Sequence, residues 1–190
     1  MQPSVIPPEF DSLVQQADYV VRGTVTSVSS EWREQNGNRN IVTLVGIDVA
    51  ETIAGTPPSP LVLVMLGGKV GDKEMIVQGA PKFTVGDEHI LFIRGNGAQF
   101  TPLVALMHGQ YPIKKDSTGR RHMTRSDGSP LRNEKEVSLP MESHAQAIAA
   151  AATPATASAD QSATTSALSP DDFASRIRNA RQKSASAHDK

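Results

Sequence analysis

Tyr19-Val20-Val21-Arg22-Gly23-Thr24-Val25-Thr26 reads as a β-strand. Side chains alternate between the two faces of a strand, so one face receives Tyr19, Val21, Gly23 and Val25. A second run, Ile41–Glu51, alternates in the same way and places on one face Ile41, Thr43, Val45, Ile47 and Val49. One buried face and one wet face is typical of an antiparallel sheet.

Further strand-like runs follow, separated by glycine, proline and asparagine. With the first two included, the predicted strands are Tyr19–Val28, Ile41–Ile53, Leu61–Leu66, Glu74–Val77, His89–Arg94, Gln99–Leu103 and Gln110–Lys114. Many short strands with turn residues between them favour a barrel or sandwich over an α/β fold. Gly23 and Gly46 lie inside strand patterns, where glycine often marks a bulge or the bend at a barrel corner. The predicted fold class is therefore mainly β, as a small OB-like antiparallel barrel.

Helix-like segments flank these strands. Residues 9–17 follow a proline pair and gather apolar side chains on one stripe. A second helix starts with Ser169 as N-cap and Pro170 in the first turn, and it is too short to be stable unless it docks on its own barrel or on a partner. Before it, Ala, Ser and Thr dominate, with too few large apolar groups to offset the entropy of ordering the backbone. The expected organisation is a lead with a short helix at 1–18, the barrel at 19–135, a disordered linker at 136–168, an amphipathic helix at 169–184 and a disordered tail at 185–190.

Composition excludes several classes of protein. The 190 residues carry 19 basic and 20 acidic side chains, and only 4% are aromatic, which argues against a surface of stacking platforms for nucleic acid. The absence of cysteine excludes disulfides, thiolate metal sites and thiol nucleophiles. No apolar stretch approaches the roughly 20 residues needed to cross a bilayer. The N-terminus lacks a signal-peptide pattern, and its abrupt, proline-rich start is consistent with an export signal that has been removed.

The sequence assembles no catalytic or metal-binding motif. Its five histidines, at positions 89, 108, 122, 144 and 188, never stand at the i, i+4 spacing of a helical zinc motif. No G-x-S-x-G element presents a nucleophilic serine, and the carboxylates are scattered over turns and outward strand faces. Gly67–Gly71 lacks the spacing of a phosphate-binding loop and fits a hairpin or long loop better. We therefore expect no enzyme, no cofactor and no metal.

A basic group lies near the end of the predicted barrel, and it consists of Lys114, Lys115, Arg120, Arg121, Arg125 and Arg132. Acidic residues between and around these positions dilute the positive charge. Protection of a sheet edge against unwanted strand pairing is therefore favoured over binding of an anion. His89 begins an apolar strand, and we expect it at the surface or hydrogen-bonded at a sheet edge.

Four residues are candidates for contact with a partner: Trp32, Lys69, Met107 and His108. Trp32 lies in a long polar loop predicted at Ser29–Asn40, and tryptophan is enriched at interface hot spots, although packing at the barrel mouth is the alternative. Lys69 is expected to be exposed in a second loop, Gly67–Lys73. The last two residues form a turn, where a histidine is more typical of a turn residue than of a general base.

Four motifs together carry a resemblance: Ala17–Val25, Val49–Gly55, the run from Gly67-Gly68 to Gly79-Ala80-Pro81-Lys82-Phe83, and Gly86–Ile93. Over roughly residues 5–115 the chain resembles a family of largely uncharacterised, exported bacterial domains. More distantly, it is similar to the netrin-like OB barrel of the tissue inhibitors of metalloproteinases. The resemblance implies a barrel of five or slightly more strands and a periplasmic or secreted location. Those inhibitors chelate the protease zinc through an N-terminal cysteine, which this chain lacks, so their mechanism is not carried over.

Two functions of different classes remain. The first is a non-enzymatic binding module of the bacterial cell envelope or secretome, which recognises a protein partner through loops on a rigid barrel. The alternative is an OB domain that binds an oligosaccharide or a nucleic acid across its sheet. The low aromatic content and near-neutral charge disfavour the alternative, and an enzyme ranks third.

Overall fold

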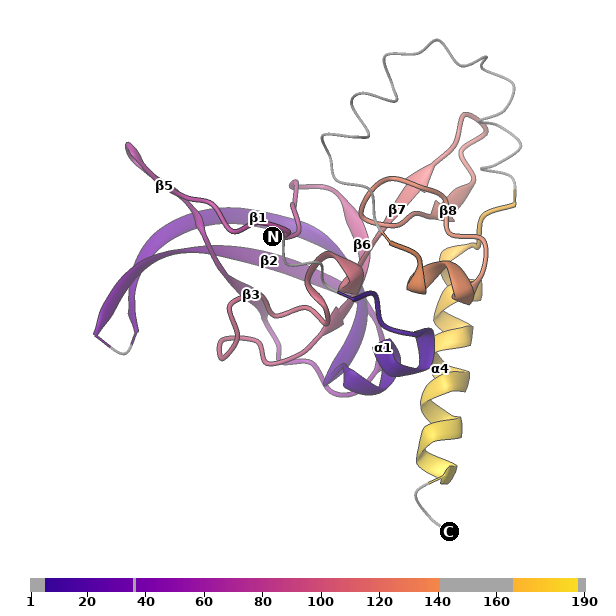
Figure 1. The fold of residues 1–190 in the computed structure, drawn as a ribbon. Coiled ribbons are helices and arrows are strands. Elements are labelled where there is room, and N and C mark those ends of the chain that lie inside the picture. The colour runs from indigo at the N-terminus through magenta and orange to yellow at the C-terminus, as the bar shows by residue number, and fades with distance from the viewer. Residues whose placement is uncertain (1–5, 36, 141–165, 188–190) are drawn as a thin grey trace.

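The structure is a computed structural model that describes residues 6–35, 37–140 and 166–187 (Figure 1). Its main sheet is antiparallel and contains, in spatial order, β3 (Leu61–Leu66), β2 (Asn38–Ala54), β1 (Tyr19–Gln35), β6 (Glu88–Ile93), β7 (Gln110–Lys115) and β8 (Arg121–Met123). A separate hairpin joins β4 (Gly68–Val70) to β5 (Lys73–Met75). The helices are α1 (Phe10–Gln16) and α4 (Pro170–Ala187), with the short 3₁₀ turns η1 (Leu106–Gly109) and η2 (Glu134–Ser138). The mainly β, antiparallel prediction is confirmed.

The strands β1 and β2 are much longer than predicted. The expected loop Ser29–Asn40 is wrong, because both strands continue as a ladder until Gln35 pairs with Asn38. Polar residues suggested a loop there, but a strand with little covering it tolerates polar side chains on both faces. We call Thr26–Gln35 with Asn38–Gly46 the arm, and Figure 1 shows it curving away from the side of the molecule that carries α4.

The bends predicted at two glycines are confirmed. The β1–β2 register shifts between Arg22 and Gly23, and again between Val25 and Ser27, opposite Gly46. A Cβ added to Gly23 would lie 2.6 Å from the carbonyl oxygen of Asp48, and one added to Gly46 would lie 2.5 Å from the Ser27 hydroxyl oxygen. At Gly23 the facing backbone therefore comes too close for a larger residue, and at Gly46 a larger residue would displace the Ser27 hydroxyl.

Two apolar cores lie on opposite sides of the sheet. The inner core fills the curl of the sheet, and its buried members are Tyr19, Val21, Val25, Val45, Ile47, Leu61, Leu63, Met65, Leu91, Ile93 and Leu103. The outer core lies between the sheet and the helices α1 and α4, and it includes Phe10, Leu13, Val14, Val20, Phe92, Tyr111, Phe173 and Ile177. The expected wet face is therefore wrong where the helices cover it, since Val20 is fully buried opposite its buried neighbours.

The described strands do not close into a barrel, because β3 and β8 are the two edges of the sheet. The segment after β6 binds the outer edge of β3 instead. The Asn96 side chain accepts a hydrogen bond from the Val64 amide at 3.0 Å and donates one to the Val62 carbonyl at 2.7 Å. The Leu66 amide donates to the Phe100 carbonyl at 2.7 Å. The strand predicted at Gln99–Leu103 is thus wrong, and the segment is a series of bends with one isolated bridge at Leu103.

The helix predicted at 169–184 is confirmed as α4, and it docks on its own sheet. Ser169 caps it as expected, since its hydroxyl oxygen accepts a hydrogen bond from the Asp172 amide at 3.1 Å. Phe173 packs its ring 5.1 Å from that of Tyr111, measured between centroids. Residues 136–140 and 166–168 of the predicted linker lie in the described chain, where Val137 and Leu168 join the outer core. Residues 141–165, with His144, and the tail at 188–190 lie outside the described residues.

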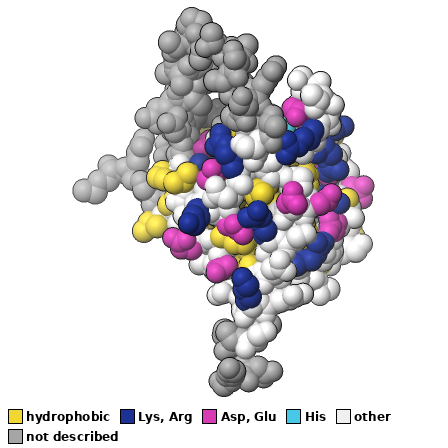
Figure 2. All heavy atoms as spheres, turned by 90° about the vertical axis from the view of Figure 1, so that its right-hand side faces the viewer, with side chains coloured by type: hydrophobic (Ala, Val, Ile, Leu, Met, Phe, Trp, Pro, Cys, Tyr) yellow, Lys and Arg dark blue, Asp and Glu magenta, His cyan; other side chains and the backbone are white. Residues whose placement is uncertain are grey.

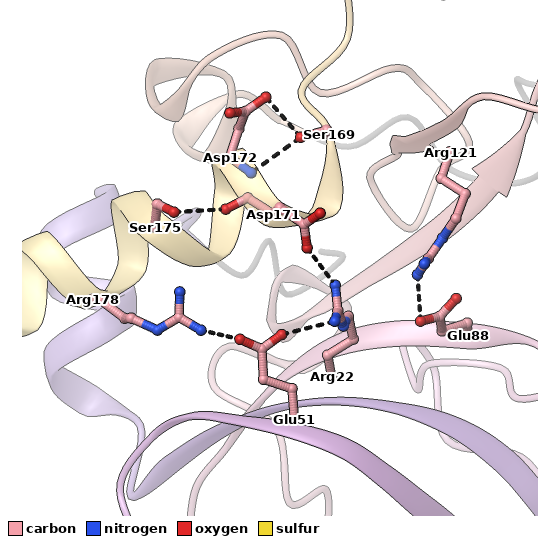
Figure 3. Close-up of polar contacts among 9 residues, drawn as sticks. All are labelled: Arg22, Glu51, Glu88, Arg121, Ser169, Asp171, Asp172, Ser175 and Arg178. Carbon is pink, nitrogen blue, oxygen red and sulfur yellow. Dashed lines mark hydrogen bonds and ion pairs between the residues drawn. The ribbon is translucent and has the colours of Figure 1, made fainter.

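Ion pairs surround the docked helix (Figure 3). Arg22 of β1 contacts Glu51 of β2 at 3.0 Å and Asp171 of α4 at 2.7 Å. Glu51 is also paired with Arg178, two turns beyond Asp171 along α4. The two strands and the helix thus share one network at the rim of the outer core.

Candidate functional site

The arm has an open backbone edge. Strand β6 accompanies β1 only from Tyr19 to Thr24. Val25 ends this pairing, because its amide donates to the Asp87 carbonyl and its carbonyl accepts from the Gly86 amide, both at 2.9 Å. From Thr26 to Gln35, no strand within the described ranges pairs with β1 on the side away from β2. Alternate amides and carbonyls along this side consequently have no ladder partner, which is the property that makes a sheet edge receptive to another strand.

The inner face of the arm is apolar at its exposed end. Val28, Ser30 and Trp32 share this face, since they pair across the ladder with Val45, Thr43 and Ile41. The side chains of Val28 and Trp32 are 40% and 38% exposed. The Arg39 guanidinium lies 4.8 Å from the centroid of the Trp32 ring, which is within the range of a cation–π interaction. This contact orients the ring and leaves part of it exposed.

The outer face of the arm is charged. Glu31 and Arg33 both point to this side and form an ion pair of 2.9 Å, with side-chain exposures of 48% and 41%. A pair this exposed adds little stability to the arm. It does place one negative and one positive charge two residues apart beside the open backbone.

The β4–β5 hairpin lies across the inner face of the arm. The predicted hairpin or long loop at Gly67–Lys73 is therefore a hairpin, and Lys69 is exposed as expected. A Cβ on Gly68 would lie 2.4 Å from both the Ser30 and the Thr43 hydroxyl oxygens, so only glycine fits there. The Lys69 amide donates to the Ser30 hydroxyl oxygen at 3.4 Å. The structure thereby brings Trp32 and Lys69 to one face of the arm.

Met107 and His108 lie elsewhere, in η1, as the predicted turn. The Ser126 hydroxyl bridges the carbonyls of Met107 and Gln110 at 2.7 and 2.8 Å, which fixes η1 against the loop after β8. His108 is only 4% exposed, and burial, followed by the charge of Arg125, lowers its pKa. The side chain that would meet a partner is therefore hidden, and these two residues do not extend the face that carries Trp32.

His89 is buried, so the expectation of a surface or hydrogen-bonded residue is wrong. It is 2% exposed, and neither ring nitrogen has a hydrogen-bond partner. The Phe83 ring packs edge-on against it, with 5.5 Å between centroids. Burial lowers the pKa of His89 to about 4, while Asp87 opposes and Lys114 reinforces the effect.

The predicted basic group is divided among separate ion pairs. Lys114 faces Asp87 at 3.6 Å, Arg121 faces Glu88 at 2.5 Å and Arg132 faces Glu136 at 3.6 Å. Arg125 is buried, pairs with Asp127 at 3.4 Å and also donates to the Leu139 carbonyl. Figure 2 shows basic and acidic side chains interleaved over the face that carries α4. This mixture does not provide the single-signed surface that an anion needs.

The described part of the chain contains no cluster of metal ligands and no membrane-spanning helix. No three His, Asp or Glu side chains converge there as a metal ion would require. No helix among these residues combines the length and the apolar character needed to span a bilayer.

Comparison with known proteins gives no relative: no family model, no curated protein and no solved structure matches the chain. What the molecule can bind is therefore inferred from the arm itself. Its open edge was not predicted from the sequence, although the alternation of Val28, Ser30 and Trp32 beyond the predicted end of the first strand is the signal that indicates it.

Proposed function

We propose that the protein is a non-enzymatic binding module that recognises an extended segment of a protein by adding it as a strand to the open edge of the arm. The observation that carries this proposal is the unpaired side of β1 from Thr26 to Gln35. Strand addition draws affinity from main-chain hydrogen bonds, and pockets or exposed side chains beside the edge select the sequence.

The side chains next to this edge support selectivity. An added strand places every second side chain over the inner face, beside the exposed apolar groups of Val28 and Trp32. The intervening side chains lie beside Glu31 and Arg33 on the outer face. A segment that alternates apolar with charged or polar residues matches both faces.

The finer description of the fold is part of the same proposal. We infer a partly open, OB-like barrel in which the segment after β6 takes the place of the closing strand. Its hydrogen bonds to the outer edge of β3, through Asn96 and Phe100, support this interpretation. The relation to netrin-like and exported bacterial domains, and with it an extracytoplasmic location, remains a proposal drawn from sequence resemblance. Fractionation of cells that express the native gene checks the location, and recovery in the cytoplasm would refute it.

A peptide selection tests strand addition. Random ten-residue peptides displayed on phage are selected against the protein, and the enriched peptides are synthesised and titrated while Trp32 emission is recorded. The chain has one tryptophan, so the signal reports on the arm alone. Methylation of single peptide amides should weaken binding at every second position, because only alternate amides of an added strand face the edge.

Variants of the protein provide the matched control. Trp32→Ala should weaken peptide binding about tenfold in calorimetry, as expected for an interface aromatic, and Lys69→Ala should weaken it less. Val62→Ala removes an apolar side chain of the same 38% exposure on β3 and should leave binding unchanged. Binding without a period of two in the methylation scan, or binding indifferent to Trp32→Ala, would contradict the proposal.

A further inference from the structure

The open edge of β1 is complementary to itself. We propose that its partner is a second copy of this chain, whose β1 pairs antiparallel with this β1 about a two-fold axis at Trp32. The inference rests on the proposed function of the edge as a strand acceptor and names the strand that it accepts.

The charges of the outer face carry the argument. In an antiparallel pair centred on Trp32, residue 31 of one copy stands opposite residue 33 of the other. Glu31 of each copy then meets Arg33 of the second copy, so two cross-strand ion pairs form from one sequence. Opposite charges directly across an antiparallel pair are stabilising, and like charges there are destabilising.

The inner face fits the same register. Trp32 meets its symmetry mate, which pairs two half-exposed aromatic rings. Ser30 stands opposite Glu34, so no second charge faces this carboxylate. From position 30 to position 34, this register sets no two like charges opposite each other.

The geometry of the arm limits the assembly to two copies. A two-fold interface uses the same patch on both molecules and therefore closes on itself. The edge ends on one side where Val25 is bonded to Gly86 and Asp87, and on the other side at the hairpin tip between Gln35 and Asn38. One strand per copy makes a small interface, so association should depend strongly on protein concentration.

Charge exchange tests the pairing by sedimentation equilibrium. The unaltered protein should be in equilibrium between monomer and dimer. Glu31→Arg places Arg opposite Arg, Arg33→Glu places Glu opposite Glu, and each alone should weaken self-association about tenfold. An equimolar mixture of these two variants should recover the dimer, because each Arg again meets a Glu across the interface. The mixture separates pairing between copies from loss of the ion pair within one arm, since neither variant regains its own pair.

Lys183→Glu, a charge reversal at an exposed position on α4, is the control and should not change the association. Equal thermal unfolding of all variants shows that they fold, as exposure of both arm positions leads us to expect. A monomeric unaltered protein, variants that dimerise normally, or a mixture that stays monomeric would each overturn the inference. If the protein is monomeric but the selected peptides still bind with a period of two, only the self-pairing fails; if no strand of either kind binds, the proposed function fails with it.

Discussion

His89 is the residue whose chemistry depends most on the fold. Its pKa is lowered to about 4 from a usual 6.5. Between these two pH values, His89 is therefore mostly protonated in the unfolded chain and mostly neutral in the folded chain. Stability should therefore be complete above about pH 6.5 and should fall as the pH drops toward 4. The loss is on the order of 3 kcal/mol, from about 1.4 kcal/mol per pKa unit.

Urea unfolding at pH 7 and pH 4.5 measures this effect. His89→Leu removes the titrating ring and should reduce the difference in free energy of unfolding between the two pH values, whatever its effect at pH 7. An NMR titration in which the His89 ring of the folded protein ionises near pH 6.5 would show that the residue is not the source.

At the level of single residues, local chemistry was predictable and burial was not. Ser169 caps α4 because the bond that it makes reaches only three residues along the chain. Gly23 and Gly46 interrupt alternating patterns, which is again a local signal. The burial of His89 depends on Phe83, which reaches it from the loop before β6, and a strand pattern contains no information about such a cover.

Among the elements, α4 is held by its apolar face more than by its charges. Phe173 is fully buried and packs against the rings of Phe10, Phe92 and Tyr111. Phe173→Ala should lower the free energy of unfolding by about 3–5 kcal/mol, because the cavity that it leaves cannot close around three fixed rings. Urea unfolding gives the value.

Arg178→Ala is the comparison for the same helix. Its side chain is 41% exposed, and loss of the ion pair to Glu51 should cost only about 0–1 kcal/mol. If Arg178→Ala destabilises as much as Phe173→Ala does, then the network in Figure 3, and not the outer core, holds the helix on the sheet.

The elements themselves show where sequence patterns suffice. Both helices were predicted because an apolar stripe and a start signal lie in one short segment. The outer part of the arm, within Ser29–Asn40, was mistaken for a loop, because the strand edge there is uncovered and polar residues are tolerated. The wet face predicted for the first strand was wrong, since the helix that covers it arrives from the far end of the chain.

For the whole molecule, the junction between β3 and the segment after β6, which we call the seam, is joined by two hydrogen bonds of the Asn96 side chain and one between Leu66 and Phe100. Asn96 both donates to and accepts from the backbone of β3, which neither a carboxylate nor a shorter side chain can do. Asn96→Asp should lower the free energy of unfolding by about 1–3 kcal/mol, because the Val62 carbonyl then loses its donor and faces a charge. Urea unfolding checks this, with Asn179→Asp on the exposed side of α4 as the control. An unchanged midpoint for Asn96→Asp would show that the two hydrogen bonds of the Asn96 side chain contribute nothing to stability.

The residue that follows Asn96 makes its side-chain amide prone to slow deamidation. Gly97 follows Asn96, and a glycine leaves its backbone nitrogen unobstructed for attack on the carbonyl carbon of the preceding side-chain amide. Ammonia leaves as a succinimide ring forms, and water then opens the ring to give aspartate or isoaspartate. While the seam is closed, the two hydrogen bonds of the Asn96 side chain also hold the amide away from that attack. Each opening of the seam exposes the amide, so the rate of this conversion at Asn96 depends on how often the junction with β3 separates.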